Sequence, residues 1–284
     1  MKYNLTQEQK QHYLERGYII IEDFLPIDIV NQLLDYHKQI KFWAFGSNNF
    51  SWNNVEWKKK GNRGQINWTD ISTETLYLIR EQKQWLKDNR YDYDVDKNGI
   101  PNNDNQTMSH NAWNYGIPPD DYYEDELHNT INYFVTRDVM KHMIPIHYEL
   151  KELLGDFREP NFQISLDMYD WWGYIGWHQD NVLEQDYPHE TPNLNSSIHL
   201  NKDWKSDWGG QLMLIDSKGD KVTFETGFNK YIAYNQVKGI GLRHCTIPIK
   251  TRNRLRRNLT IRDFKNDAGS WGFFHYDKQG NINV

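Results

Sequence analysis

Two histidines and one aspartate are the side chains whose types and spacing could do chemistry. His178 and Asp180 are separated by one residue, and His244 lies far along the chain. In an extended segment residues i and i+2 point the same way, so the first two would present an imidazole and a carboxylate together. Two histidines and a carboxylate on one face of an octahedron suit Fe(II), since three positions stay open. Most His-x-Asp triplets are surface or capping accidents, so the spacing alone is weak.

Short strands must position these residues. From Asn161 onward, alternating or apolar segments are separated by turn residues. The expected strands are 164–169, 196–200, 211–215, 221–224, 231–234 and 255–264. This spacing predicts an antiparallel sandwich or jelly roll that packs against N-terminal helices.

The N-terminal segment predicts helices around one buried strand. Thr6 is a suitable N-cap with Gln9 as its capping-box partner, and that helix should stop at Gly17. Residues 18–22 read as a buried strand, and Pro26 opens a second helix with one apolar face.

The chain is expected to form one domain, 1–284, in three parts. Helices occupy about 1–40, an irregular aromatic-rich insertion about 43–135, and a β-core about 160–264. Within the less regular part, 73–87 and 129–153 are predicted helices, and Gly155 should end the second.

Composition excludes several classes of protein. The net charge of −6 argues against nucleic acid as a partner, although it does not exclude a local basic groove. Cys245 is the single cysteine, which excludes an intramolecular disulfide. The sequence has neither the apolar run of a signal peptide nor a long apolar stretch. We therefore expect a cytoplasmic protein that does not enter a membrane; its oligomeric state stays open.

Four segments together resemble the Fe(II)/2-oxoglutarate dioxygenases, and within them the prolyl 4-hydroxylase type. They lie in the family's order within residues 160–264, and their combination is specific although each alone is weak. The segments are Tyr169 with Trp177-His178-Gln179-Asp180-Asn181, Ile198-His199-Leu200-Asn201-Lys202-Asp203-Trp204, Gly209-Gly210-Gln211-Leu212, and His244-Cys245-Thr246-Ile247-Pro248 with Arg256-Arg257-Asn258-Leu259-Thr260-Ile261.

The resemblance implies a mainly β fold with flanking helices, built on a double-stranded β-helix core of jelly-roll, cupin-like form. It also implies Fe(II) on His178, Asp180 and His244, with 2-oxoglutarate and O2 as co-substrates. The implied reaction couples oxidative decarboxylation of 2-oxoglutarate to hydroxylation of a C–H bond, with a peptidyl proline or an amino-acid-like compound as substrate.

In this family an arginine grips the distal carboxylate of 2-oxoglutarate, because its planar fork forms two parallel hydrogen bonds. The register before Leu259 assigns this role to Arg256. Arg254 is a rival, since the loop after His244 is slightly longer than usual and alternation puts both arginines on one face. Arg257 and Arg262 are expected to be solvated on the opposite face.

Four further residues are candidate contacts of the co-substrate. Tyr169 and Thr260 match family positions whose hydroxyls help to bind it, and Asn258 shares the strand face of Arg256. His199 stands where the family commonly has a tyrosine. An ordinary buried polar residue with a local partner is the alternative for each.

Two other interpretations concern the substrate and the class of protein. The N-terminal segment resembles the opening of phytanoyl-CoA dioxygenases, which share the fold and chemistry but act on small molecules. A jelly roll that binds glycans through exposed tryptophans is the non-enzymatic alternative. The segment Asp94–Asn105 also resembles a calcium loop, but it lacks the glutamate expected at its last position.

Overall fold

The computed structural model describes residues 4–40, 42–47, 65–67, 110–117, 126–157, 161–179, 192–237, 241–264, 274–280 and 282–283. Its strands are β1 (Tyr18–Ile21), β2 (Phe42–Ser47), β3 (Gln65–Asn67), β4 (His110–Ile117), β5 (Asn161–Tyr169), β6 (Tyr174–His178), β7 (Pro192–Leu200), β8 (Leu212–Ile215), β9 (Lys221–Phe224), β10 (Phe228–Asn235), β11 (His244–Thr246), β12 (Arg256–Phe264), β13 (Phe274–Tyr276) and β14 (Ile282–Asn283). The helices are α1 (Gln7–Arg16), α2 (Ile27–Gln39), α4 (Glu126–Phe134), the π-helical turn η3 (Val135–Val139), α5 (Met140–Leu153) and the 3-10 turn η5 (Ser206–Trp208).

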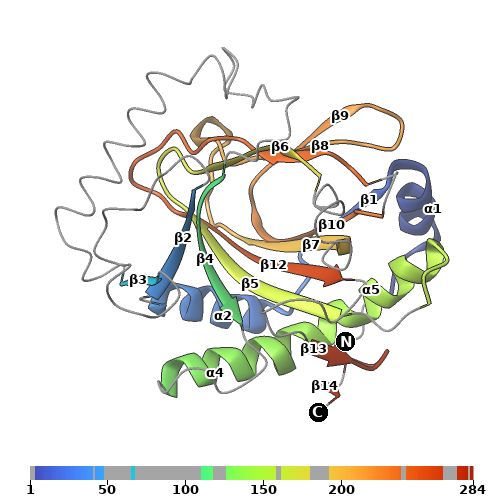
Figure 1. Cartoon of the computed structure of the whole chain (residues 1–284), viewed down its shortest axis with the longest axis horizontal. Helices are drawn as coiled ribbons and strands as arrows, with labels where there is room; N and C mark the ends of the chain where they lie inside the picture. Colours follow the sequence, from blue (N-terminus) through green and yellow to red (C-terminus); the bar gives the residue numbers. More distant parts are fainter. Residues whose placement is uncertain are drawn as a thin grey trace.

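The strands form two facing layers, as a jelly roll requires (Figure 1). The major layer runs in the order β1-β10-β7-β12-β5-β4, and the minor layer runs β6-β11-β8-β9. Strand β4 pairs antiparallel with both β5 and β6, so it joins the layers. The antiparallel pairing confirms the predicted fold class.

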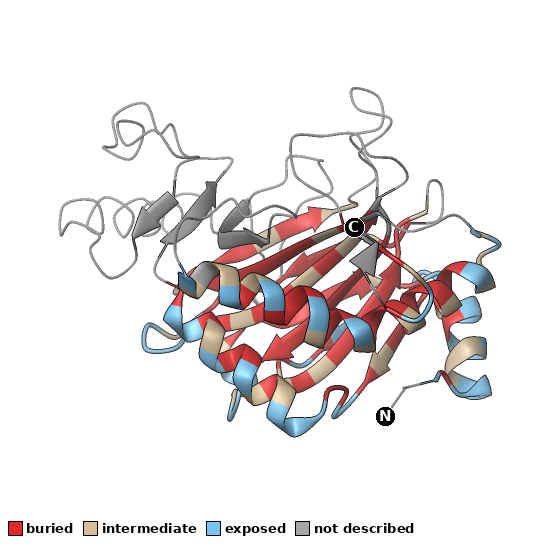
Figure 2. Ribbon diagram, turned by 90° about the horizontal axis from the view of Figure 1, so that it is seen from below, coloured by how far each residue is buried: buried red, intermediate tan, exposed pale blue. Residues whose placement is uncertain are grey.

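The outward face of the major layer carries the main hydrophobic core. Alternate residues of β5 and β12 on this face are apolar, including Ile164, Leu166, Leu259 and Ile261, and all are buried. They pack against α2, η3 and α5, which cover the layer from below (Figure 2). Burying these side chains, at about 1.5–3 kcal/mol each, is what holds the helices against the sheet.

The inward face of the same layer is polar. Antiparallel partners share a face, so the pairs Asn258↔His199 and Thr260↔Ser197 place four polar side chains toward the minor layer. Asp167 joins them through its pairing with Asn258. A row of buried polar groups between two sheets costs stability unless its members are hydrogen-bonded, which marks this face as a candidate site.

The predicted N-terminal elements are confirmed. Thr6 caps α1 and forms the expected capping box with Gln9, and Gly17 ends the helix in the left-handed conformation that glycine adopts most easily. Pro26 is the N-cap of α2.

The segment predicted as an irregular insertion, about 43–135, is not separate from the β-core. Strands β3 and β4 fall within 43–135 and β2 begins one residue before it, and β4 is an integral part of the sheet. The predicted helix 129–153 is present as α4, η3 and α5, and it ends before Gly155. The predicted helix 73–87 lies outside the described residues. None of the described helices is long and apolar enough to cross a membrane.

Acid should unfold this protein through two histidines buried beside the sheet. Burial lowers the pKa of both His37 and His147 to about 3 from 6.5. Between these values the unfolded chain binds more protons, so stability falls as the pH drops below 6.5. From pH 7 to 5 we expect each histidine to cost about 2 kcal/mol. Urea unfolding at both pH values measures the loss. His147→Gln should remove about 2 kcal/mol of it, and an unchanged loss would contradict this account.

Candidate active site

Two of the three predicted metal ligands meet on neighbouring strands. His178 ends β6 and His244 begins β11, and the two are direct cross-strand partners. Their ring centroids lie 4.1 Å apart. The Tyr234 ring on β10 lies 4.7 Å from that of His244, so the pair faces the space between the layers.

Both imidazoles are oriented through the same nitrogen. Nδ1 of His178 lies 2.8 Å from the carbonyl oxygen of Gly176. Nδ1 of His244 lies 3.2 Å from that of Leu242. The tautomer that donates Nδ1–H to a carbonyl carries its lone pair on Nε2, as a metal-binding histidine requires. The two imidazoles therefore fit a metal ion.

The third predicted ligand, Asp180, lies outside the described residues, one position beyond Gln179. No group of three histidine, cysteine, aspartate or glutamate side chains that could hold a metal occurs within the described part of the chain. Full metal coordination therefore stays a prediction. The calcium-like segment Asp94–Asn105 also falls outside the described residues.

Arg256 begins β12 and is buried, with 3% of its surface exposed. Its Nη1 donates to Oδ1 of Asn258 at 2.8 Å, and its guanidinium carbon lies 4.7 Å from the centre of the Tyr169 ring. Burial lowers the pKa of the guanidinium, while Tyr169 and Asp167 act in the opposite direction. Among the described residues its Nε has no hydrogen-bond partner. A buried cation with an unused donor is suited to bind an anion.

The rival arginine lies elsewhere. Arg254 precedes β12 and is exposed, with its guanidinium 5.3 Å from the centre of the Trp208 ring. Arg262 is on the inward face, because it pairs with Asn195 in the row that holds Thr260; its expected place on the opposite face is wrong. Arg257 is on the outward face but is not simply solvated, since burial lowers its pKa to about 10.

Two ring-bearing residues flank Arg256. Nε2 of His199 lies 3.4 Å from Nη2 of Arg256. Burial, reinforced by the charge of Arg256, holds the pKa of His199 well below its usual range, so the ring is neutral and can accept that hydrogen bond. Burial also raises the pKa of the Tyr169 phenol to about 12. Thr246 of β11 acts on the pKa of this phenol in the opposite direction to burial.

Thr260 and Asn258 lead to a residue that sequence reasoning missed. The Thr260 hydroxyl donates to the carboxylate of Asp167, and Nδ2 of Asn258 donates to the same oxygen at 3.1 Å. Asp167 is itself buried on β5, where Ser165 donates to its second oxygen. The available signal was an aspartate at an inward position of a predicted strand, two residues before Tyr169.

The Gly209-Gly210 turn explains how Arg256 is accommodated. A Cβ atom on Gly209 would lie 2.0 Å from the carbonyl oxygen of Pro248. A Cβ atom on Gly210 would lie 3.0 Å from Cδ of Arg256, and both glycines have positive φ. Only glycine allows the backbone to pass this close to the buried arginine.

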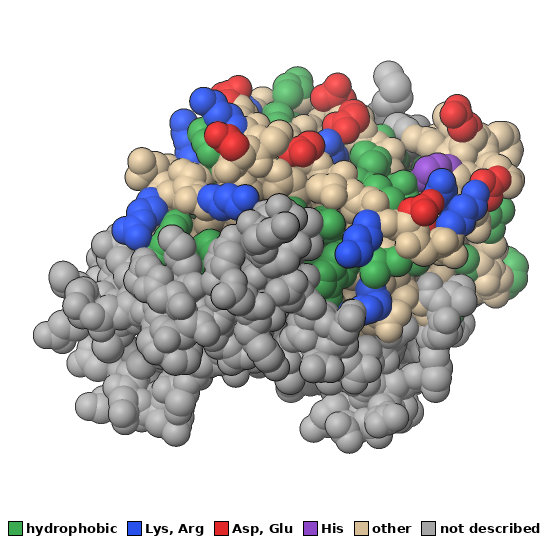
Figure 3. All heavy atoms as spheres, turned by 90° about the horizontal axis from the view of Figure 1, so that it is seen from above, with side chains coloured by type: hydrophobic (Ala, Val, Ile, Leu, Met, Phe, Trp, Pro, Cys, Tyr) green, Lys and Arg blue, Asp and Glu red, His purple; other side chains and the backbone are tan. Residues whose placement is uncertain are grey.

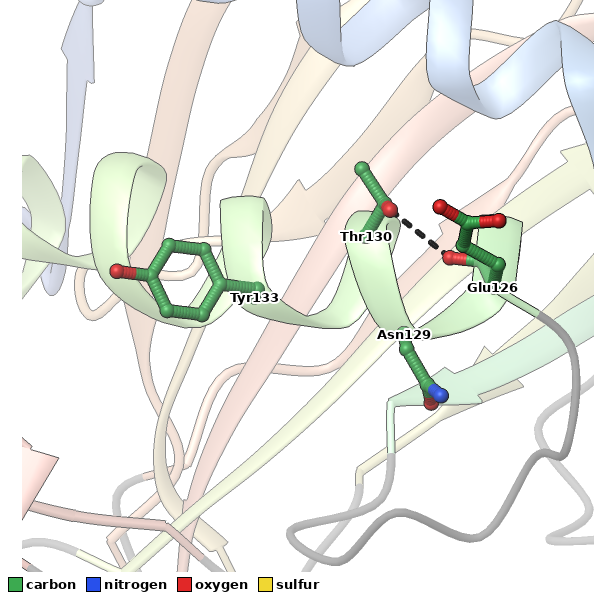
Figure 4. A pocket seen from close by; sticks show the side chains of 4 residues that line it. All are labelled: Glu126, Asn129, Thr130 and Tyr133. Atoms are coloured by element: carbon green, nitrogen blue, oxygen red, sulfur yellow. Dashed lines mark hydrogen bonds between the residues drawn. The ribbon is translucent and has the colours of Figure 1, made fainter.

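Other surface features do not add to this site. A surface pocket on α4 is lined by Glu126, Asn129, Thr130 and Tyr133, and Thr130 donates to the carbonyl of Glu126 (Figure 4). That helix lies on the opposite side of the major layer from β6 and β8 (Figure 1). Basic and acidic side chains both occur on the face seen in Figure 3.

Solved structures with this fold are known. A prolyl-4-hydroxylase from Pseudomonas putida aligns with a TM-score of 0.53 and 13% identity, over 91% of this chain and 98% of that one. A prolyl hydroxylase from Trichoplax adhaerens, in complex with a hypoxia inducible factor peptide fragment, gives 0.53 and 14%, over 90% and 87%. A Burkholderia pseudomallei oxidoreductase of the 2OG-Fe(II) oxygenase family gives 0.52 and 8%, over 94% and 95%.

No protein-family model matches the sequence, and no curated protein matches it. At these identities the likeness establishes the fold: the chain has the prolyl 4-hydroxylase-like fold of 2OG-Fe(II) oxygenases. The predicted double-stranded β-helix is thereby confirmed.

Proposed function

We propose that this protein is a non-haem Fe(II) dioxygenase that couples oxidative decarboxylation of 2-oxoglutarate to hydroxylation of a C–H bond. One observation carries the proposal. The cross-strand pair His178 and His244 and the buried cation Arg256 both face the interior of a 2OG-oxygenase fold. Imidazole ligands such as the two histidines suit Fe(II), and a buried arginine suits a carboxylate of 2-oxoglutarate.

Each residue has a distinct task. His178, Asp180 and His244 would hold the metal, and Arg256 would anchor the distal carboxylate of 2-oxoglutarate. Tyr169, His199 and Asn258 surround the guanidinium and limit its motion. Fe(II), when bound with 2-oxoglutarate and O2, would supply the oxidising chemistry. The protein's own contribution is orientation and the exclusion of water from a buried interior.

The environment of Thr260 favours a supporting task over a direct contact with the co-substrate. Its hydroxyl is committed to the carboxylate of Asp167. We propose that Thr260 supports the pocket from behind Asn258 and that the closer contacts to the co-substrate come from Arg256 and Tyr169.

The proposed substrate is a peptidyl proline or an amino-acid-like compound. The Trichoplax adhaerens protein is solved with a peptide, and that neighbour aligns over 87% of its own length. A small-molecule hydroxylase of the phytanoyl-CoA dioxygenase type is the second candidate, because the segment that resembles that family forms the capped α1 and the buried β1. Calcium at Asp94–Asn105 has no observation behind it and is not part of the proposal.

Anaerobic spectroscopy tests the proposed function. Adding Fe(II) and then 2-oxoglutarate should produce a weak visible metal-to-ligand band, which a glycan-binding jelly roll would not give. A screen for succinate release against peptide and metabolite pools, with product masses measured, then identifies the substrate. A protein that develops no band and releases no succinate would refute the assignment.

A further inference from the structure

A chain of hydrogen bonds leads from Arg256 to a carboxylate that does not touch it. Nη1 of Arg256 donates to Oδ1 of Asn258 at 2.8 Å, and Nδ2 of Asn258 donates to Oδ2 of Asp167 at 3.1 Å. All three side chains are buried, with exposed fractions of 3%, 4% and 6%. The chain runs across the neighbouring strands β12 and β5 on the inward face.

The two ends of this chain fix the orientation of the amide between them. The Thr260 hydroxyl, which accepts from Nδ2 at 2.7 Å and donates to Asp167, agrees with the same orientation. A guanidinium can only donate hydrogen bonds, and an ionised carboxylate can only accept them. Asn258 therefore satisfies both neighbours in one orientation alone, with its oxygen toward Arg256 and its nitrogen toward Asp167. If the amide rotated by 180°, donor would face donor and acceptor would face acceptor inside a buried site, at the cost of both hydrogen bonds.

The spacing also leaves Arg256 available to a ligand. No described carboxylate forms an ion pair with it, yet the charge of Asp167 helps to keep the guanidinium protonated. A carboxylate in direct contact would occupy the fork that a ligand needs. With one amide in between, Asp167 supplies a counter-charge without taking that position.

We propose that Asp167 is a positioning residue for the anion pocket: through Asn258 it fixes the guanidinium of Arg256 in the orientation that receives the distal carboxylate of a dicarboxylate ligand. This inference rests on the proposed function for the identity of the ligand, but the relay itself belongs to the protein alone. Asp167 thereby affects the affinity for the co-substrate, although it acts through the side chain of Asn258.

Removing the charge of Asp167 has two opposing effects on the affinity for a dicarboxylate, so the direction of the change distinguishes between them. An anion near the pocket repels a dicarboxylate, so neutralising it should strengthen binding if electrostatics dominate. If the relay dominates, Asp167→Asn frees the Asn258 amide to rotate, and binding should weaken by about tenfold. The Asn258→Ala background separates the two effects, because the relay is already broken there.

Calorimetric titration of the anaerobic, Fe(II)-loaded protein with 2-oxoglutarate measures these affinities without turnover. We expect Asp167→Asn to weaken binding in the wild-type background and to leave it unchanged or strengthen it in the Asn258→Ala background. Asp35→Asn, an exposed site with the same charge change, is the control and should bind as the parent does. Equal weakening in both backgrounds, or no weakening in the first, overturns the relay.

A second measurement needs no ligand. NMR of the Arg256 guanidinium should show restricted Nη hydrogens in the parent protein and in Asp35→Asn, and averaged ones in Asp167→Asn. Restriction that survives Asp167→Asn overturns the relay whatever the titrations give. If the parent binds no 2-oxoglutarate but the NMR result is as expected, the proposed function fails and the relay stands.

Discussion

His178→Ala and His244→Ala will each abolish Fe(II)-dependent turnover while the protein stays folded. The two imidazoles are cross-strand partners at the end of β6 and the start of β11, with ring centroids 4.1 Å apart. Removing one leaves the metal with too few ligands to keep it at neutral pH. Both side chains point into the interior rather than into the core below the major layer, so the loss of either should change stability little.

Metal content and succinate release, measured on the same samples, check this result. His142→Ala is a matched control, because that histidine lies on α5 in the helix layer. Melting temperatures confirm that the variants are folded. Succinate formation near the parent's rate in either His178→Ala or His244→Ala would contradict the assignment of these ligands. Asp180→Ala should behave like the two histidine variants, and it tests the ligand that lies outside the described residues.

Arg256→Ala will lower the apparent affinity for 2-oxoglutarate by about 30- to 1000-fold, because a charge-assisted hydrogen bond in a buried site contributes about 2–4 kcal/mol. Arg254→Ala should stay within a few-fold of the parent, since its guanidinium is exposed over Trp208. Arg256→Lys should recover only part of the loss, because an ammonium cannot form the two-pronged contact. The dependence of turnover on 2-oxoglutarate concentration measures all three.

A larger defect in Arg254→Ala than in Arg256→Ala would contradict the assignment of Arg256 as the anchor of the distal carboxylate. The maximal rate helps to exclude a folding artefact. Loss of the anchor should raise the concentration of 2-oxoglutarate that is needed, and the maximal rate should fall less than the affinity does.

Much of the fold could be predicted because local signals were strong. The capping box at Thr6 and the alternation of 164–169 both lie in single elements and are confirmed. Strand β4 could not be recognised in the same way. It is formed by His110–Ile117, a segment rich in polar and aromatic residues, and it becomes a strand because β5 and β6 supply its hydrogen-bond partners. That information is not local.

The candidate site shows the same division. Family spacing proposed Arg256 over Arg254, whereas alternation placed both on one face. What separates them in the structure is where β12 begins: Arg256 is its first residue, and Arg254 lies in the loop before it. Asp167 was overlooked because a single aspartate in a strand carries no motif; its meaning comes from Asn258 across the strand pair.

Strand β12 lines the interior with one face and contributes to the hydrophobic core with the other. Asn258 and Thr260 lie toward the interior, while Leu259 and Ile261 lie in the core that the helices cover. Asp263, on the core side, forms a buried ion pair with Lys151 of α5 at 2.8 Å. Substitutions at the inward positions of β12 can therefore change what the interior binds, while the residues that pack against the helices stay the same. Only one layer of β-strands separates the residues proposed to bind ligands from the hydrophobic core that stabilises the fold.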